Sequence, residues 1–340
     1  MAVRVLVTGG TGFIGGAVVR ELVGRGHAVR VCARPASDAA AVEAAGAEVV
    51  RAELHEAGAV RRALDGCEAV VHCAGRAGLR PGPGAELRAA DVDAADVVLG
   101  AAREAGVARA VFTSSTAVQG GGRTPAVVDE AGPGNAESLG IPCFTSKQAG
   151  ERVARAHAGR GLPLVILRPA CVLGPGDVRG AATGVVVALA HRRIPGFVDG
   201  GASYCDVRDV ARAHGEALER GTAGAVYTLG GHNLTNAELV ARVCALAGVA
   251  PPRKMAYSAA MAIAAAEEIT ASLQRRRAAI TRDLIRASAL YTFASAERAG
   301  ADLGYTLLPF DESVLATLRW AVAAGELAPD TDALRALAAG

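Results

Sequence analysis

The residues that could do chemistry most directly are Cys143 and Lys147, which stand four apart in the segment Pro142-Cys-Phe-Thr-Ser-Lys147. A thiol has an ordinary pKa of about 8.5 and is chemically able to donate a proton. Lysine is rare in this chain, which has only Lys147 and Lys254 among 36 lysines and arginines. A lysine at this position is therefore a signal for chemistry and not a by-product of composition.

A glycine-rich turn near the amino terminus, Thr8-Gly-Gly-Thr-Gly-Phe-Ile-Gly15, follows a predicted strand and opens a predicted helix. Gly9 and Gly12 let the backbone turn tightly and approach a pyrophosphate, whose negative charge the amides of the helix N-terminus meet. Gly15 lets the helix lie close on the sheet. The pattern predicts dinucleotide binding. The predicted contacts in this loop are Gly9, Thr11, Gly12, Phe13 and Ile14.

The end of the second predicted strand distinguishes the two nicotinamide cofactors. An acidic residue there would hydrogen-bond the adenosine ribose of NAD, whereas a guanidinium pairs with the 2′-phosphate of NADP. The chain has Arg34 at this point, which favours NADPH/NADP+; the alternative is an ordinary solvent-facing arginine in an arginine-rich chain. Glu53 and Leu54 after the third strand, and Ala74 after the fourth, stand where the cofactor would pass.

These residues need a parallel sheet to position them, and short β-branched runs do alternate with helical patterns over the first two thirds of the chain. Seven candidate strands predict a Rossmann-type, doubly wound α/β fold. The candidate strands are 3–7, 28–32, 48–51, 69–73, 110–113, 164–168 and 225–229. Amphipathic helices are predicted at 18–23, 57–64, 94–105 and 146–157.

After Pro169 the alternation loosens, with a helix predicted over 180–193 and an almost wholly helical pattern beyond Gly248. We therefore expect a smaller, mainly helical substrate lobe. The predicted ranges are 1–172 and 203–230 for an NADP-binding domain, and 173–202 and 231–340 for the lobe. Residues 258–274 are rich in Ala, Ile and Met with few charges, so the segment around 255–285 either forms a lid over a flat hydrophobic ligand or packs within the lobe.

Composition excludes several classes of function. With a net charge of +2 and 21% charged residues, the chain has no dense basic run with interleaved aromatics, so nucleic acid is not an expected partner. The nearly uncharged stretch 255–266 is shorter than the ~20 residues that span a bilayer, and no membrane role is expected. Seven scattered cysteines predict no metal site and indicate free thiols in a reducing cytoplasm. We expect a small-molecule substrate and a monomer or homodimer.

The ordered motifs resemble those of the extended short-chain dehydrogenase/reductases, nearest to the dihydroflavonol reductase and 3β-hydroxysteroid dehydrogenase branch. The motifs are TGGTGFIG at 8–15, FTSS at 112–115, CFTSKQAGE at 143–151, LRP at 167–169 with GPG at 174–176, and YCDVRDVA at 204–211. The resemblance implies that Ser115 hydrogen-bonds a substrate carbonyl and that Lys147 holds the nicotinamide ribose. It also implies cofactor contacts at Thr113 and from Pro169 to Val172.

The chain departs from this family at the proton donor, a tyrosine four residues before the lysine. Cys143 stands there, and none of the five tyrosines precedes a lysine by four. Where the family has N-V-x-G-T, the segment Asp91-Val-Asp-Ala-Ala95 lacks the asparagine and the glycine. Both changes weaken the usual proton relay.

A cysteine sulfur stops roughly 3–4 Å short of where a tyrosine oxygen would sit, whereas general acid catalysis needs heavy atoms within about 2.6–3.2 Å. Cys143 is therefore either an acid that reaches only a deeply inserted substrate or a small apolar filler beside Lys147. The vacated ring volume can hold a water or part of a larger, flatter substrate. A phenol next to the ketone would supply the proton, and aromatic polyketides carry such groups.

The leading hypothesis is an oxidoreductase, an NADPH-dependent ketoreductase acting on a bulky aromatic ketone. In its composition and its missing tyrosine, the chain resembles tyrosine-lacking ketoreductases of polyketide antibiotic biosynthesis, which act on angucyclinone-like substrates. An alternative is a non-catalytic NADP-binding regulator, which would not need the tyrosine. The retained Ser115 and Lys147 argue against this alternative. An epimerase or dehydratase of nucleotide sugars fits the fold but usually needs a tyrosine base.

Overall fold

The computed structural model describes residues 2–76, 84–131, 134–177 and 182–339. Its centre is a seven-stranded parallel sheet with the strand order β11-β7-β5-β4-β1-β2-β3. The strands are β1 (Arg4–Thr8), β2 (Ala28–Ala33), β3 (Glu48–Arg51), β4 (Ala69–His72), β5 (Arg109–Thr113), β7 (Leu164–Pro169) and β11 (Val226–Leu229). The predicted doubly wound α/β fold is confirmed, and each strand lies where the sequence pattern places it.

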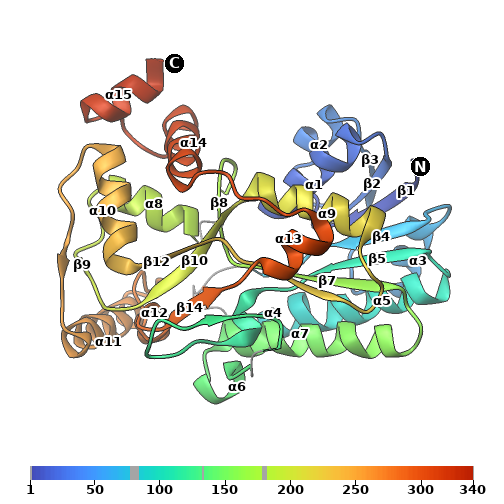
Figure 1. The fold of residues 1–340 in the computed structure, drawn as a ribbon, viewed down its shortest axis with the longest axis horizontal. Helices are drawn as coiled ribbons and strands as arrows, with labels where there is room; N and C mark the ends of the chain where they lie inside the picture. The colour runs from blue at the N-terminus through green and yellow to red at the C-terminus, as the bar shows by residue number, and fades with distance from the viewer. Residues whose placement is uncertain (1, 77–83, 132–133, 178–181, 340) are drawn as a thin grey trace.

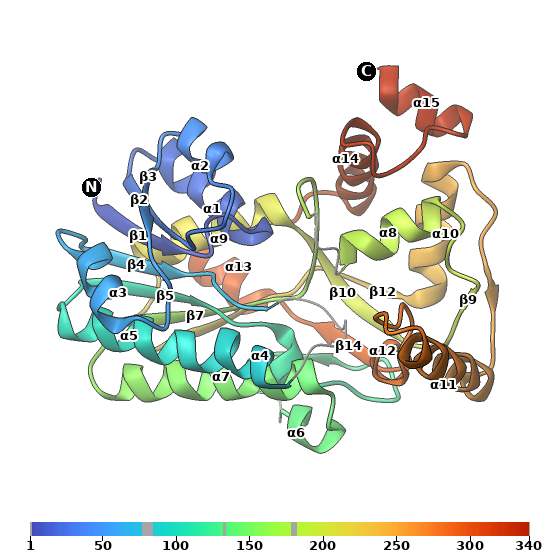
Figure 2. The same ribbon diagram turned by 180° about the vertical axis from the view of Figure 1, so that it is seen from behind.

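The strands are apolar throughout because helices cover both faces of the sheet. Along β1, Val5 and Val7 belong to one buried cluster and Leu6, which points to the other face, belongs to a second. Figure 2 shows the two layers on either side of the sheet. One layer contains α1 (Phe13–Gly24) and α9 (Val207–Arg220), and the other contains α3 (Ala57–Leu64), α5 (Ala94–Glu104) and α7 (Pro142–Gly159).

The strand order reverses between β1 and β4, because the chain runs from β1 towards β3 on one side and from β4 towards β11 on the other. A crevice opens at such a switch point, outside the carboxyl ends of the strands. The glycine-rich loop follows β1 and the segment from Cys73 to Arg76 follows β4. The fold therefore brings two of the predicted cofactor-binding segments to one place.

The remaining part of the molecule contains a smaller sheet and most of the later helices (Figure 1). Its strands are β6 (Val127–Val128), β8 (Cys171–Leu173), β10 (Gly201–Asp206), β12 (His232–Thr235) and β14 (Tyr291–Ala294), with β9 (Gly196–Phe197) and β13 (Arg253–Lys254) paired separately. Its helices are α8 (Ala182–Ala190), α10 (Asn236–Ala247), α11 (Tyr257–Leu273), α12 (Arg282–Ser288), α14 (Phe310–Ala323) and α15 (Asp332–Ala339). The lobe is mainly helical, but the sequence pattern missed its short strands. Gly180 and Ala181, the start of the helix predicted over 180–193, lie outside the described residues.

The chain crosses between the two parts more often than the predicted ranges imply. Tyr204, expected in the nucleotide-binding range, lies in β10 and pairs with Cys171 of β8 and His232 of β12. Helix α13 (Glu297–Leu303), expected in the substrate range, returns to pack on α9 and β11. Nowhere in the described ranges is a helix both long and apolar enough to cross a membrane.

Candidate active site

The loop after β1 closes in a way that only glycines allow. Gly9 has φ +72°, and a Cβ there would lie 2.6 Å from the Ala74 backbone nitrogen. A Cβ on Gly15 would collide with the carbonyl oxygen of Gly9, which accepts a hydrogen bond of 2.9 Å from the Gly12 amide. No described side chain caps the start of α1, so the helix presents backbone amides at the crevice. Thr11, Phe13 and Ile14 are half-buried around it, and this cradle fits a dinucleotide pyrophosphate.

The adenine end of the predicted cofactor site lies where β2 and β3 end side by side. Arg34 follows β2 with an exposed side chain, and no carboxylate in the described part of the chain pairs with it. Arg51, at the end of β3, donates to the backbone carbonyls of Arg34 (3.2 Å) and Ser37 (2.6 Å). This holds the loop in place and leaves the Arg34 guanidinium available. Glu53 and Leu54 lie two and three residues after Arg51 and are half-buried.

Lys147 forms an ion pair that the sequence analysis missed. Its Nζ donates to Oδ1 of Asp91 at 2.8 Å, and the Asp91 side chain is only 2% exposed. The same carboxylate accepts the Arg76 amide at 2.9 Å and the Ser146 hydroxyl at 2.8 Å. Three donors therefore fix Asp91, and Asp91 fixes the ammonium of Lys147.

The backbone around this pair is close-packed. Asp91 lies in a π-helical turn, Ala89–Asp93, which often marks a functional site. A Cβ on Gly150 of α7 would collide with the carbonyl oxygen of Asp91, and a Cβ on Gly75 would lie 2.8 Å from Lys147 Nζ. The loop after β4, predicted to run along the cofactor, thus passes directly over the ion pair. A signal was present in the sequence, because Asp91 is an acid at a motif position and Lys147 is one of two lysines.

Cys143 lies in the first turn of α7, because the helix begins at Pro142 and not at residue 146 as predicted; proline is favoured at this first position. Its neighbours are apolar and include Phe144, Ala287 and Leu290. Burial raises the pKa of the Cys143 thiol to about 12, and the nearby Lys147 charge only partly opposes this. The short side chain and its apolar neighbours favour the apolar filler over the acid.

Three consecutive hydroxyl side chains stand at the end of β5, the last residue of the strand and the two after it, and they face different surroundings. Thr113 contacts Nε2 of His214 at 2.8 Å, and Ser114 donates to Glu151 at 2.6 Å. Ser115 caps the 3₁₀ helix Thr116–Gln119 by accepting the Ala117 amide at 3.1 Å. Within the described ranges the Ser115 hydroxyl has no acceptor for its hydrogen, so this hydroxyl can donate to a ligand.

The remaining predicted contacts line the junction of the two sheets. Pro169 ends β7 opposite Leu229, and Val172 in β8 pairs with Cys205 of β10. His72, just below Ala74, is 1% exposed and is bonded to Thr8 at 2.8 Å. Burial lowers its pKa to about 4, and the Lys147 charge adds to this. His72 is therefore neutral and packed.

Comparison with known proteins covers both parts of the molecule. The model of the NAD dependent epimerase/dehydratase family matches residues 5–230. A Stigmatella aurantiaca protein, 4-hydroxy-2-methyl-3-oxo-4-farnesyl-3,4-dihydroquinoline-1-oxide ketoreductase, is 34% identical over 66% of this chain and 67% of its own length. The solved structure of gox2253 is 31% identical, with a TM-score of 0.83 over 96% of this chain and 99% of that one. UDP-glucose 4-epimerase of Thermus thermophilus, in complex with NAD, is 25% identical, with a TM-score of 0.74 over 93% and 98%.

Proposed function

Because the chain belongs to the NAD dependent epimerase/dehydratase family, we propose that it is an NADPH-dependent ketoreductase of a bulky, angucyclinone-like aromatic polyketide. The observation that carries the proposal is the state of Cys143. Its side chain is too short to reach the place of a tyrosine oxygen, and its neighbours are apolar, so no acid occupies the proton-donating position of the family's tyrosine. The proton therefore comes from a substrate hydroxyl or from water. The quinoline ketoreductase of Stigmatella aurantiaca supports a ring ketone as the substrate class.

In this proposal each residue of the site has a separate task. The glycine loop holds the pyrophosphate of the cofactor, which supplies a hydride when bound, and Arg34 pairs with its 2′-phosphate. Lys147, anchored by Asp91, binds the ribose hydroxyls. Ser115 donates its free hydroxyl hydrogen to the carbonyl oxygen and so stabilises the charge that develops there.

Replacement of Cys143 by alanine is expected to retain most of the activity, within about a factor of three, because the thiol lies among apolar neighbours and is too short to reach the carbonyl oxygen. The measurement is the loss of reduced-nicotinamide absorbance with a hydroxy-substituted polycyclic ketone. A matched ketone with a methoxy group in place of the adjacent hydroxyl should react much more slowly. An inactive Cys143→Ala protein that still binds NADPH would show that the thiol is the donor.

Arg34→Ala is expected to weaken NADPH binding about a hundredfold and to leave NADH binding nearly unchanged, because only NADPH carries the 2′-phosphate that a guanidinium pairs with. Fluorescence titration of both cofactors measures this difference. Arg20→Ala is a suitable control, since Arg20 is an exposed arginine on the neighbouring α1. Equal losses for the two cofactors would rule out the phosphate contact.

Two alternative functions, a regulator and a nucleotide-sugar epimerase, would give different results in assays. A regulator would bind NADPH tightly and reduce none of a broad panel of ketones. A nucleotide-sugar epimerase, which the Thermus thermophilus neighbour suggests, would convert UDP-glucose in the presence of NAD. An epimerase must remove a hydroxyl proton, and the pKa of Cys143 is too high for that thiol to act as a base near neutral pH.

A further inference from the structure

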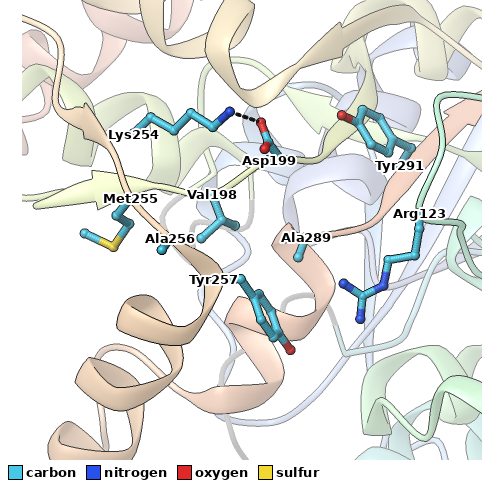
Figure 3. Close-up of a pocket in the computed structure, with 9 residues that line it drawn as sticks. All are labelled: Arg123, Val198, Asp199, Lys254, Met255, Ala256, Tyr257, Ala289 and Tyr291. Carbon is cyan, nitrogen blue, oxygen red and sulfur yellow. Dashed lines mark ion pairs between the residues drawn. The ribbon is translucent and has the colours of Figure 1, made fainter.

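A cleft of about 630 Å³ opens between the start of α11, the start of β14 and the loop before β6 (Figure 3). The lining residues are Arg123, Val198, Asp199, Lys254, Met255, Ala256, Tyr257, Ala289 and Tyr291. Its volume is within the range of small-molecule sites. It lies at one end of the segment 255–285. The sequence was compatible with two roles for this segment, a lid over a ligand or packing within the lobe. Lys254, the second of the two lysines, is also here.

The cleft and the surroundings of Cys143 are built from adjoining residues of one segment. Leu290 is buried in the apolar cluster around Cys143, whereas its neighbours Ala289 and Tyr291 line the cleft. This short segment therefore contributes side chains both to the surroundings of Cys143 and to the cleft. A ligand in the cleft would contact the same segment, where the distal part of a long substrate would extend.

The walls of the cleft are held rigidly. Gly122 exchanges two backbone hydrogen bonds with Tyr291, at 3.1 and 2.8 Å, and this pair anchors the loop that carries Arg123. The Tyr291 ring packs edge-on against Phe293, with 5.6 Å between centroids. A Cβ on Gly200, just after the lining residue Asp199, would collide with the backbone under the cleft. The cleft is thus built before any ligand arrives, which lowers the entropic cost of binding.

The charges that line the cleft sum to one surplus positive charge. Lys254 pairs with Asp199 at 2.8 Å. The Arg123 guanidinium lies 5.5 Å from the Tyr257 ring centroid and points towards that ring in Figure 3. No described carboxylate pairs with Arg123. A guanidinium stacked on a phenol ring keeps its in-plane donors free for a carboxylate.

We propose that this cleft binds a flat aromatic ligand that carries a single negative charge, a ring carboxylate or an ionised ring hydroxyl. Arg123 would hold the anion, and Tyr257, Tyr291 and Met255 would contact the rings. One surplus charge matches a monoanion and falls short of a diphosphate, which disfavours a nucleotide. The inference rests on the proposed ketoreductase function, since it takes the ligand to be the distal part of the ketone substrate.

The test compares a dihydroxyanthraquinone carboxylic acid with its carboxamide, by calorimetric titration of the protein saturated with NADP+. We expect the acid to bind about tenfold more tightly than the amide, and Arg123→Met to remove that difference by weakening the acid alone. Arg253→Met is the matched control, because Arg253 is exposed in β13 next to Lys254 and does not line the cleft. NADPH affinity should be unchanged in both variants, which confirms that each is folded.

Equal binding of acid and amide to the wild-type protein would overturn the inference and leave the ketoreductase proposal untouched. Arg123-dependent binding of the acid, with no reduction of any hydroxylated ketone, would overturn the ketoreductase proposal alone. UDP binding that is tighter than acid binding and is lost in Arg123→Met would show that the cleft takes a nucleotide. A gain in affinity for the acid in Arg123→Met would exclude the assigned contact.

Discussion

Lys147→Met should lower kcat/KM for ketone reduction by roughly 100- to 1,000-fold, the usual cost of removing one fixed charged donor from a reaction site. Among the described residues, Lys147 has a hydrogen bond to Asp91, and Cys143 stands at the place of the tyrosine through which such a lysine would partly act. Methionine keeps most of the length and packing of the side chain and removes the ammonium group, with its charge and its hydrogen bond to Asp91. Steady-state kinetics measure the rate, and NADPH fluorescence titration shows how much of the loss is binding.

Asp91→Asn tests whether the lysine depends on its carboxylate partner. We expect about tenfold weaker NADPH binding in this variant and almost no additional loss when it is combined with Lys147→Met, because Asp91 acts through Lys147. Asp93→Asn, two residues further along and exposed, should be silent. If the losses of the two single variants add in the double variant, Asp91 has a merely structural role.

Arg168→Met is expected to lower the free energy of unfolding by about 3–5 kcal/mol, because it leaves a buried carboxylate without its main partner. Arg168 and Glu151 are 9% and 5% exposed and share two hydrogen bonds, at 2.9 and 2.6 Å. Urea denaturation measures the change. The control is Arg152→Met on the same helix as Glu151; its pair with Glu137 is more than half exposed, so the loss should stay below about 1 kcal/mol.

The same pair predicts a pH dependence. Burial raises the pKa of the Glu151 carboxyl, but the hydrogen bonds and charge of Arg168 outweigh it and hold the pKa below its ordinary value of 4.5. Stability from this group is therefore present above pH 4.5 and is lost as the pH falls through the lowered pKa. The difference in the free energy of unfolding between wild type and Arg168→Met should therefore decrease as the pH falls below 4.5. A difference that stays constant down to about pH 3 would contradict the assignment.

The central sheet was predictable because each strand is a short apolar run that ends at a glycine or polar turn, a signal that is local in the sequence. The separate pair of β9 and β13 was not, since these strands are two residues each and exist only by pairing 57 residues apart. Asp91 and Lys147 were both visible as unusual residues, but their contact spans 56 positions. It depends on a π-helical turn that no residue pattern indicates.

The cleft could not be predicted from the sequence for the same reason, because its residues are far apart in the chain. The scarcity of lysine drew attention to Lys254, and the low charge of 258–274 drew attention to the segment after it. Arg123, however, stands in a loop 134 residues before Tyr257 and looks like any other arginine of an arginine-rich chain. It comes to the same place through the backbone pairing of Gly122 with Tyr291 and of β6 with β14. Chemistry that is assembled from distant loops leaves little trace in a single sequence.

The repeated crossing of the chain between its two parts has a consequence for how this protein could acquire new substrates. Helix α13, from the last fifth of the chain, completes the packing of the first sheet, and the chain passes directly from β7 of that sheet into β8 of the second. Exchange of the later part with a relative would remove side chains on which the nucleotide-binding part depends. Divergence of specificity is therefore expected by point substitution at positions such as Arg123 and Tyr257, and not by recombination of intact modules.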